Sequence, residues 1–133
     1  MTIALNHTIV PARDKVESAK FFAKVFGLSF DKSAVGYFAP VRVNETLTLD
    51  FDDDYSINDR FDVHHYAFHV SDQEFDEIFT RVQEMGIPFG SGPQNLEDKR
   101  LNDWNGGRGV YFRDPNGHIL ELLTRDSNMK ESQ

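Results

Sequence analysis

Two stretches of the chain begin alike, HTIVPARD at residues 7–14 and HYAFHVSD at residues 65–72. In each stretch six residues separate an opening histidine from a closing aspartate. A glycine followed by Leu or Ile comes at a similar distance afterwards, Gly27 in the first copy and Gly86 in the second. A repeat of this kind predicts that one structural unit occurs twice.

Each copy carries the pattern of an amphipathic helix ahead of its glycine. Apolar side chains recur at spacings of three and four residues, which places them on one helical stripe. Asp14 and Ser71 are each followed three positions later by glutamate, which is typical of a helix start. Gly27 and Gly86 stand where a left-handed residue commonly ends a helix. The sequence therefore predicts one helix in each copy.

Strands are predicted on both sides of each helix. The histidine of each copy lies in the strand before the helix, and turn-separated apolar and β-branched runs follow the helix. Residues 114–117 form a Pro- and Gly-containing tight turn that makes the last two runs a hairpin. The order βαβββ thus occurs twice, and the fold class is α+β. The predicted strands after the helices are residues 28–32, 36–43 and 46–52 in the first copy and residues 87–91, 108–113 and 118–124 in the second.

We expect one domain that spans residues 1–133 and contains two modules. The first module covers about residues 1–52, and the second about residues 63–125. The Asp-rich stretch at 53–62 is the predicted linker.

Composition restricts the partners and the compartment. The chain has 22 acidic and 14 basic residues, a formal net charge of −8, and no basic cluster. Nucleic acid is therefore not expected as a partner. The absence of cysteine excludes disulfides and thiolate metal ligands. No apolar run reaches the length of a membrane span, so we expect no membrane contact and a cytoplasmic protein.

Three residues are candidates for a metal site because they are polar among apolar neighbours. Glu121 lies in the middle of a strand of Ile and Leu, where a carboxylate needs a cation or strong hydrogen bonds. The alternative is that Glu121 stands on an exposed edge and faces water. His7 also alternates with apolar residues, and strand parity favours His65 over His64 as the inward-facing histidine. Two histidines and one carboxylate match the facial triad that leaves metal positions open.

The chain resembles the vicinal-oxygen-chelate superfamily, which includes glyoxalases, extradiol dioxygenases, fosfomycin-modifying enzymes and bleomycin-binding proteins. The similarity covers residues 3–125. It implies two βαβββ modules that form a cupped, barrel-like mixed sheet with the two main helices outside. It also implies that His7, His65 and Glu121 hold a divalent metal. The motifs that carry it are LNHTIV at 5–10 with Asp14, HYAF at 65–68 with Val70 and Asp72, and YFRDPNGHILEL at 111–122.

The chemistry implied by this resemblance is the binding of neighbouring substrate oxygens to the metal. An Fe²⁺ dioxygenase acting on an aromatic or polyketide-like compound agrees best with the three ligands and the aromatic content. One alternative is a glyoxalase-like isomerase or lyase, or a thiol transferase, that uses Mn²⁺, Zn²⁺ or Ni²⁺. Another is a bleomycin-resistance-type protein that binds a drug without catalysis.

Further candidates belong to the second module. His69 shares a strand face with His65 and is a candidate acid or base, and Tyr111 is a candidate hydrogen-bond donor to substrate. His118 follows the turn and is predicted to be a solvated surface residue. The long connection at 92–107 is expected to cover the site or to contact a second subunit, and we expect a homodimer. The substrate-binding candidates are Trp104 and Arg108.

Overall fold

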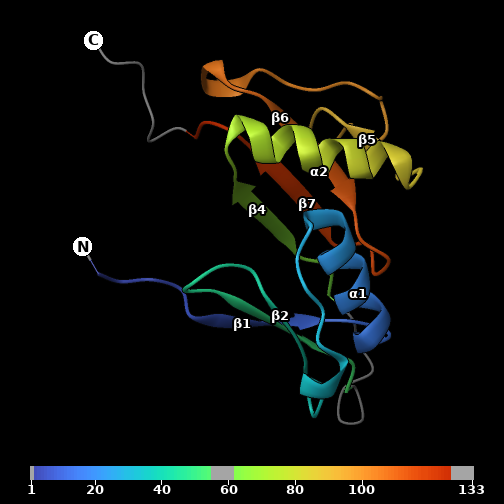
Figure 1. The fold of residues 1–133 in the computed structure, drawn as a ribbon. Helices are drawn as coiled ribbons and strands as arrows, with labels where there is room; N and C mark the ends of the chain where they lie inside the picture. The colour runs from blue at the N-terminus through green and yellow to red at the C-terminus, as the bar shows by residue number, and fades with distance from the viewer. Residues whose placement is uncertain (1, 55–61, 127–133) are drawn as a thin grey trace. The chain divides into compact units, whose positions relative to one another are not determined.

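The computed structural model describes residues 2–54 and 62–126 of the chain. It separates into two compact units, Met1–Val63 and His64–Gln133. Each unit combines one α-helix with one mixed β-sheet, as Figure 1 shows. The α+β fold class predicted from the sequence is therefore confirmed.

The first unit contains a three-stranded sheet in the order β1-β3-β2. The strands β1 and β3 are parallel, and β2 is antiparallel to β3. Contacts run from α1 to both β2 and β3, so the helix covers one face of the sheet. The elements are β1 (His7–Pro11), α1 (Lys15–Phe26), the 3₁₀ helix η1 (Lys32–Ala34), β2 (Ala39–Arg42) and β3 (Thr48–Asp52).

The second unit contains a four-stranded sheet in the order β4-β7-β6-β5. The strands β4 and β7 are parallel, whereas β6 is antiparallel to both of its neighbours. Its elements are β4 (His65–His69), α2 (Asp72–Glu84), β5 (Phe89–Gly90), the 3₁₀ helix η2 (Trp104–Gly106), β6 (Gly109–Arg113) and β7 (Ile119–Leu123).

Both helices begin and end at the predicted signals. The Asp14 carboxylate accepts hydrogen bonds from the backbone N–H groups of Val16 and Glu17. Ser71 and Glu74 form a complete capping box at the start of α2. Gly27 follows α1 with a φ of 71°, the left-handed conformation that glycine adopts without strain.

The strand predicted at 28–32 is not formed. Residues 28–31 have no regular secondary structure, and η1 begins at Lys32. The Asp31 carboxylate accepts hydrogen bonds from the backbone N–H and the hydroxyl of Ser33. Such local bonds compete with a sheet ladder for the same backbone groups. The first sheet therefore has three strands, whereas the second has four.

The predicted linker at 53–62 falls largely on residues 55–61, which lie outside the described residues. The other predicted strands after the helices form as β2, β3, β5, β6 and β7, each shorter than predicted by one to four residues. In the part of the chain that the structure describes, no helix is long and apolar enough to cross a membrane.

Candidate metal centre

The sheet of the second unit has one apolar face and one face that carries the candidate site residues. Leu120, Leu122, Val110 and Phe112 alternate with the site residues and are at most 3% exposed. Across the sheet, Glu121 on β7 is aligned with Ala67 on β4 and with Tyr111 on β6. Since aligned residues of neighbouring strands share a face, His65, Tyr111 and Glu121 lie on the same side.

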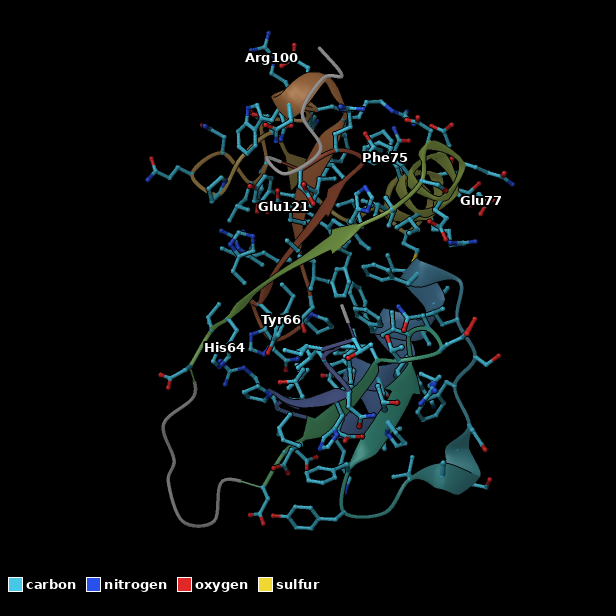
Figure 2. The ribbon with its side chains drawn as sticks, turned by 90° about the vertical axis from the view of Figure 1, so that its left-hand side faces the viewer. His64, Tyr66, Phe75, Glu77, Arg100 and Glu121 are labelled. Atoms are coloured by element: carbon cyan, nitrogen blue, oxygen red, sulfur yellow. The ribbon has the colours of Figure 1, made fainter. Side chains whose placement is uncertain are left out.

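His65 and Glu121 are in direct contact on this face. The His65 Nε2 atom lies 2.9 Å from Glu121 Oε1. The His65 side chain is 43% exposed, whereas that of Glu121 is only 12% exposed. The imidazole therefore covers a carboxylate that is largely withdrawn from solvent. Figure 2 labels Glu121 among the side chains of the second sheet.

Tyr111 is the second partner of Glu121. Burial, the negative charge of Glu121 and a side-chain hydrogen bond to Glu121 together raise the pKa of the Tyr111 phenol. The phenol therefore stays protonated over the ordinary pH range, and its O–H donates a hydrogen bond to the carboxylate. The Tyr111 ring also lies beside the His65 ring, with centroids 5.7 Å apart.

Trp104 extends this cluster toward solvent. Its ring stands edge-on to Tyr111 with centroids 5.9 Å apart, and the residue is 48% exposed. An exposed tryptophan edge beside a buried polar group is typical of a surface that receives a ligand. The structure thus brings four of the candidate residues together: His65, Trp104, Tyr111 and Glu121.

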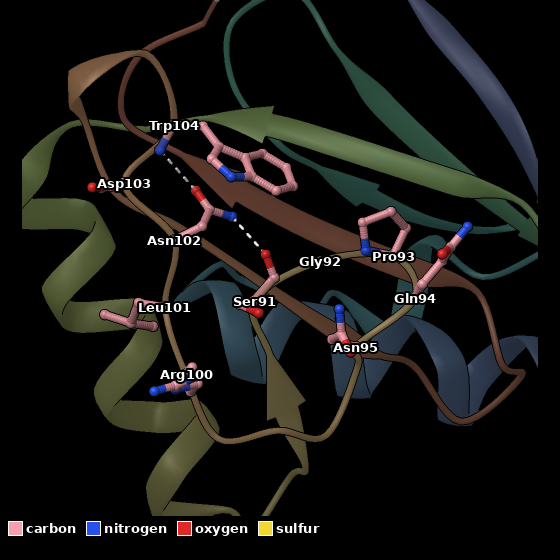
Figure 3. A pocket seen from close by; sticks show the side chains of 10 residues that line it. All are labelled: Ser91, Gly92, Pro93, Gln94, Asn95, Arg100, Leu101, Asn102, Asp103 and Trp104. Carbon is pink, nitrogen blue, oxygen red and sulfur yellow. Dashed lines mark hydrogen bonds between the residues drawn. The ribbon is translucent and has the colours of Figure 1, made fainter.

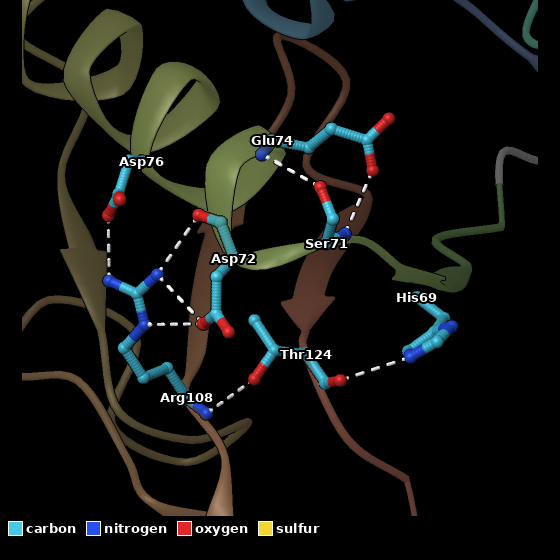
Figure 4. Close-up of polar contacts among 7 residues, drawn as sticks. All are labelled: His69, Ser71, Asp72, Glu74, Asp76, Arg108 and Thr124. Atoms are coloured by element: carbon cyan, nitrogen blue, oxygen red, sulfur yellow. Dashed lines mark hydrogen bonds and ion pairs between the residues drawn. The ribbon is translucent and has the colours of Figure 1, made fainter.

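His69 does not join this cluster. Its Nε2 atom lies 3.0 Å from the backbone carbonyl oxygen of Thr124, just beyond the end of β7 (Figure 4). The side chain thereby ties the ends of two parallel strands together.

Arg108 is engaged with helix α2. Its guanidinium donates hydrogen bonds to the carboxylates of Asp72 and Asp76 and lies 4.4 Å from the centroid of the Phe75 ring. The hydrogen bond to Asp76 is the main reason that the pKa of Arg108 is raised. Figure 4 shows this network at the start of the helix. The arrangement links the segment before β6 to α2 rather than to Glu121.

His7 belongs to the first unit. It opens β1 and is aligned with Thr48 on β3. Its neighbours Ile9 and Asp50 are aligned in the same way, on the face opposite the buried side chains of Val10 and Leu49. The His7 Nδ1 atom lies 2.8 Å from the side-chain oxygen of Asn6.

His118 corrects the prediction of a solvated surface residue. It is fully buried, and its Nδ1 atom accepts a hydrogen bond of 2.9 Å from the backbone N–H of His64. The next residue, Ile119, donates its backbone N–H to the His64 carbonyl oxygen. His64 directly precedes His65, so both bonds fix the chain next to the candidate ligand. The residue pattern gave no signal for this role, because the turn before His118 is itself buried through Asp114 and Asn116.

The donor set in the second unit agrees with a divalent metal. Imidazole nitrogen and carboxylate oxygen are ligands of Fe²⁺, Zn²⁺, Ni²⁺ and Mn²⁺. The imidazole of His65 and the phenol of Tyr111, which contact Glu121, carry no permanent positive charge to offset a carboxylate withdrawn from water. Within residues 2–54 and 62–126, no group of three or more His, Cys, Asp or Glu side chains is placed to hold a metal. The second unit contributes a pair of donors, and His7 belongs to the first.

Comparison with known proteins finds both oxidases and transferases. The solved structure of the oxidase ChaP-H2 is 44% identical, with a TM-score of 0.85 over 95% of this chain and 96% of that chain. The metallothiol transferase FosB of Lysinibacillus sphaericus is 30% identical over 93% of this chain and 84% of its own length. The structure of the fosfomycin resistance protein FosX of Mesorhizobium loti, 20% identical with a TM-score of 0.67 over 96% and 97% of the two chains, shares the fold.

A comparison with protein families matches residues 4–122, nearly the whole described chain. The match includes the strand of His7, the strand of His65 and the part of β7 that carries Glu121. The relatives of this family are metal-dependent enzymes, among them oxidases, thiol transferases and lyases. The chain belongs to the Glyoxalase/Bleomycin resistance protein/Dioxygenase superfamily, the vicinal-oxygen-chelate fold.

Proposed function

We propose that this chain is an Fe²⁺-dependent dioxygenase that acts on an aromatic or polyketide-like compound with two neighbouring oxygens. His7, His65 and Glu121 would hold the metal. The observation that carries the proposal is the contact of His65 with the shielded carboxylate of Glu121, 2.9 Å apart, beside the rings of Tyr111 and Trp104. Nitrogen and oxygen donors next to aromatic surfaces suit a flat substrate that chelates through oxygen.

Each residue of the second unit has a definite part in this proposal. The bound metal would supply a Lewis acid for the two substrate oxygens and an open position for dioxygen. The Tyr111 hydroxyl donates a hydrogen bond to Glu121, which would orient the carboxylate toward the metal. His65 reaches the same carboxylate from β4. Trp104 offers an exposed aromatic surface at the side of the Tyr111 ring.

The relatives support oxidation more strongly than the other activities. The two oxidase structures, ChaP-H2 and ChaP-H1, are 44% and 42% identical and cover nearly the whole chain. Enzymes that bind a phosphonate need free cationic side chains. Here the guanidinium of Arg108 is held by Asp72 and Asp76. The proposal also includes His69 as an acid or base and Arg108 as a substrate contact.

A thiol transferase is the second candidate function. The similarity to the metallothiol transferase FosB, 30% identical over 93% of the chain, favours it. It would use the same three ligands with Mn²⁺, Zn²⁺ or Ni²⁺, as would a glyoxalase-like isomerase or lyase. A drug-binding protein of the bleomycin-resistance type is the least favoured, because it has no use for a carboxylate paired with an imidazole inside a sheet.

An oxygen electrode distinguishes these functions. We expect protein loaded with Fe²⁺ under anaerobic conditions to consume dioxygen when air and catechol are added. Protein loaded with Zn²⁺ is the control and should consume none, because Zn²⁺ is redox-inactive. Absence of oxygen uptake, together with metal-dependent loss of a thiol in the presence of an epoxide, would instead establish the transferase.

We also propose that the chain forms a homodimer and binds a small molecule. Ile3, Leu5 and Ile9 are 88%, 64% and 41% exposed, an unusual row of apolar side chains around His7. Burial of such a row against a second copy would stabilise it. Analytical ultracentrifugation at micromolar concentration is expected to give twice the chain mass. A single monomeric species would contradict the assembly without affecting the metal proposal.

A further inference from the structure

A cavity beside the candidate metal centre lies inside the connection between β5 and β6. It has a volume of about 800 Å³ and is formed entirely by residues 91–104 of the second unit. Figure 3 shows the side chains that line it, with the Trp104 indole reaching across toward Pro93. This connection is the long segment for which the sequence predicted a role at the site.

The loop around the cavity is tied together by its own hydrogen bonds. The Asp98 carboxylate accepts hydrogen bonds from the backbone N–H and hydroxyl of Ser91 and from the backbone N–H of Arg100. The Asn102 carboxamide donates to the Ser91 carbonyl oxygen and accepts from the backbone N–H of Trp104. The cavity is therefore formed before any ligand arrives, which lowers the entropy cost of binding.

Two glycines allow the loop to pack closely against its neighbouring strands. A Cβ atom on Gly109 would lie 2.6 Å from the Asn102 side-chain oxygen, and one on Gly90 would lie 1.7 Å from the Asn95 carbonyl oxygen. Both distances are far below van der Waals contact. The absence of side chains at these two positions therefore allows the loop to lie against β5 and β6.

The lining is mostly uncharged: of its ten residues only Arg100 and Asp103 carry a charge, and the two charges are opposite in sign. Trp104 and Pro93 supply flat apolar surfaces, and the exposed carboxamides of Gln94 and Asn95 supply donors and acceptors. In Figure 3, Arg100 and Leu101 extend away from the indole, on the other side of the loop. A net charge of −8 for the whole chain also disfavours an anionic ligand. This lining suits a flat, uncharged ring that carries hydroxyl or carbonyl oxygens.

The cavity adjoins the candidate metal centre through one residue. Trp104 lines the cavity and also contacts the Tyr111 ring, whose hydroxyl binds Glu121. We infer that the cavity is a second subsite, which stacks a further uncharged ring of the substrate on Trp104 while the neighbouring oxygens of the first ring bind the metal that Glu121 would help to hold. The inference rests on the proposed function. It deepens that function by assigning a substrate with at least two fused or linked rings.

The experiment compares two neutral diols that differ by one ring, catechol and 2,3-dihydroxynaphthalene. Calorimetry with Zn²⁺-loaded protein gives both dissociation constants without turnover. We expect the naphthalene diol to bind about tenfold more tightly, since stacking and burial of a second ring favour it. The ratio should fall toward one in Trp104→Ala and recover in Trp104→Phe. Tyr37→Ala is the matched control, because Tyr37 is an exposed aromatic residue that does not line the cavity, and it should keep the wild-type ratio.

A second measurement separates the subsite from the metal centre. Trp104 is the single tryptophan of the chain, so one indole N–H resonance reports on the cavity. The naphthalene diol should shift it in the wild type and in Glu121→Gln. An unchanged indole resonance, or an unchanged ratio in Trp104→Ala, would overturn the subsite even if the protein consumes oxygen. A shifted resonance and a ratio lost in Trp104→Ala would uphold the subsite even if no oxygen is consumed.

Discussion

Replacement of Glu121 by alanine is expected to weaken divalent metal binding by more than about a hundredfold, since loss of an outer-shell partner alone costs about tenfold to a hundredfold. The change removes the only carboxylate oxygen that His65 contacts on this face of the sheet among the described residues. Titration with Co²⁺, followed by its visible absorption, measures the affinity. His65→Ala should give a loss of similar size because both side chains belong to one proposed site.

The control for this prediction is Glu84→Ala, which removes an exposed carboxylate from α2. It should leave Co²⁺ affinity unchanged, so that a general effect of net charge is excluded. Thermal unfolding of each metal-free variant tests whether the fold survives. Wild-type affinity in a folded Glu121→Ala variant would show that the carboxylate does not bind the metal.

Substitution of His118 by leucine is expected to lower the free energy of unfolding by about 1–3 kcal/mol, the cost of leaving a buried donor without a partner. The donor is the backbone N–H of His64, which in the wild type donates a hydrogen bond of 2.9 Å to the Nδ1 atom of the buried His118. Leucine approximates the volume of the ring but has no acceptor. Urea unfolding of the metal-free protein, with the slope compared among variants, measures the difference.

Two further variants separate the hydrogen bond from ring packing. His118→Asn places a carboxamide oxygen near the position of Nδ1 and should recover part of the lost stability. His64→Ala keeps the backbone donor and removes only the ring that lies 5.6 Å from His118, so it should cost less than His118→Leu. Equal stability of the leucine variant and the wild type would contradict the assigned bond.

The helices could be predicted because their signals are local. Asp14 and Ser71 bind backbone groups within three residues, and Gly27 ends its helix through its own backbone freedom. The strand predicted at 28–32 failed for a similar local reason, the capping of η1 by Asp31. The apolar pattern from which the strand was predicted does not reveal that a nearby side chain will bind the same backbone groups.

The sequence could predict the part of the candidate site that depends on which face of a strand each side chain occupies. Alternation places His65 and Glu121 on one face, and the sheet register adds Tyr111 to that face. The roles of Arg108 and His118 depend on partners 32 to 54 residues away, Asp76 and His64, and no local pattern encodes those contacts. The same holds for the loop cavity, whose shape follows from side chains that bind backbone groups across the loop.

The central claim is that His7, His65 and Glu121 bind one divalent metal. Anomalous diffraction at the iron absorption edge, from crystals grown anaerobically with Fe²⁺, tests it most directly. The proposal predicts one strong peak per chain, about 2.0–2.2 Å from a nitrogen of His7, a nitrogen of His65 and an oxygen of Glu121. A peak that any of the three side chains does not reach, or crystals without a peak at this place, would contradict it.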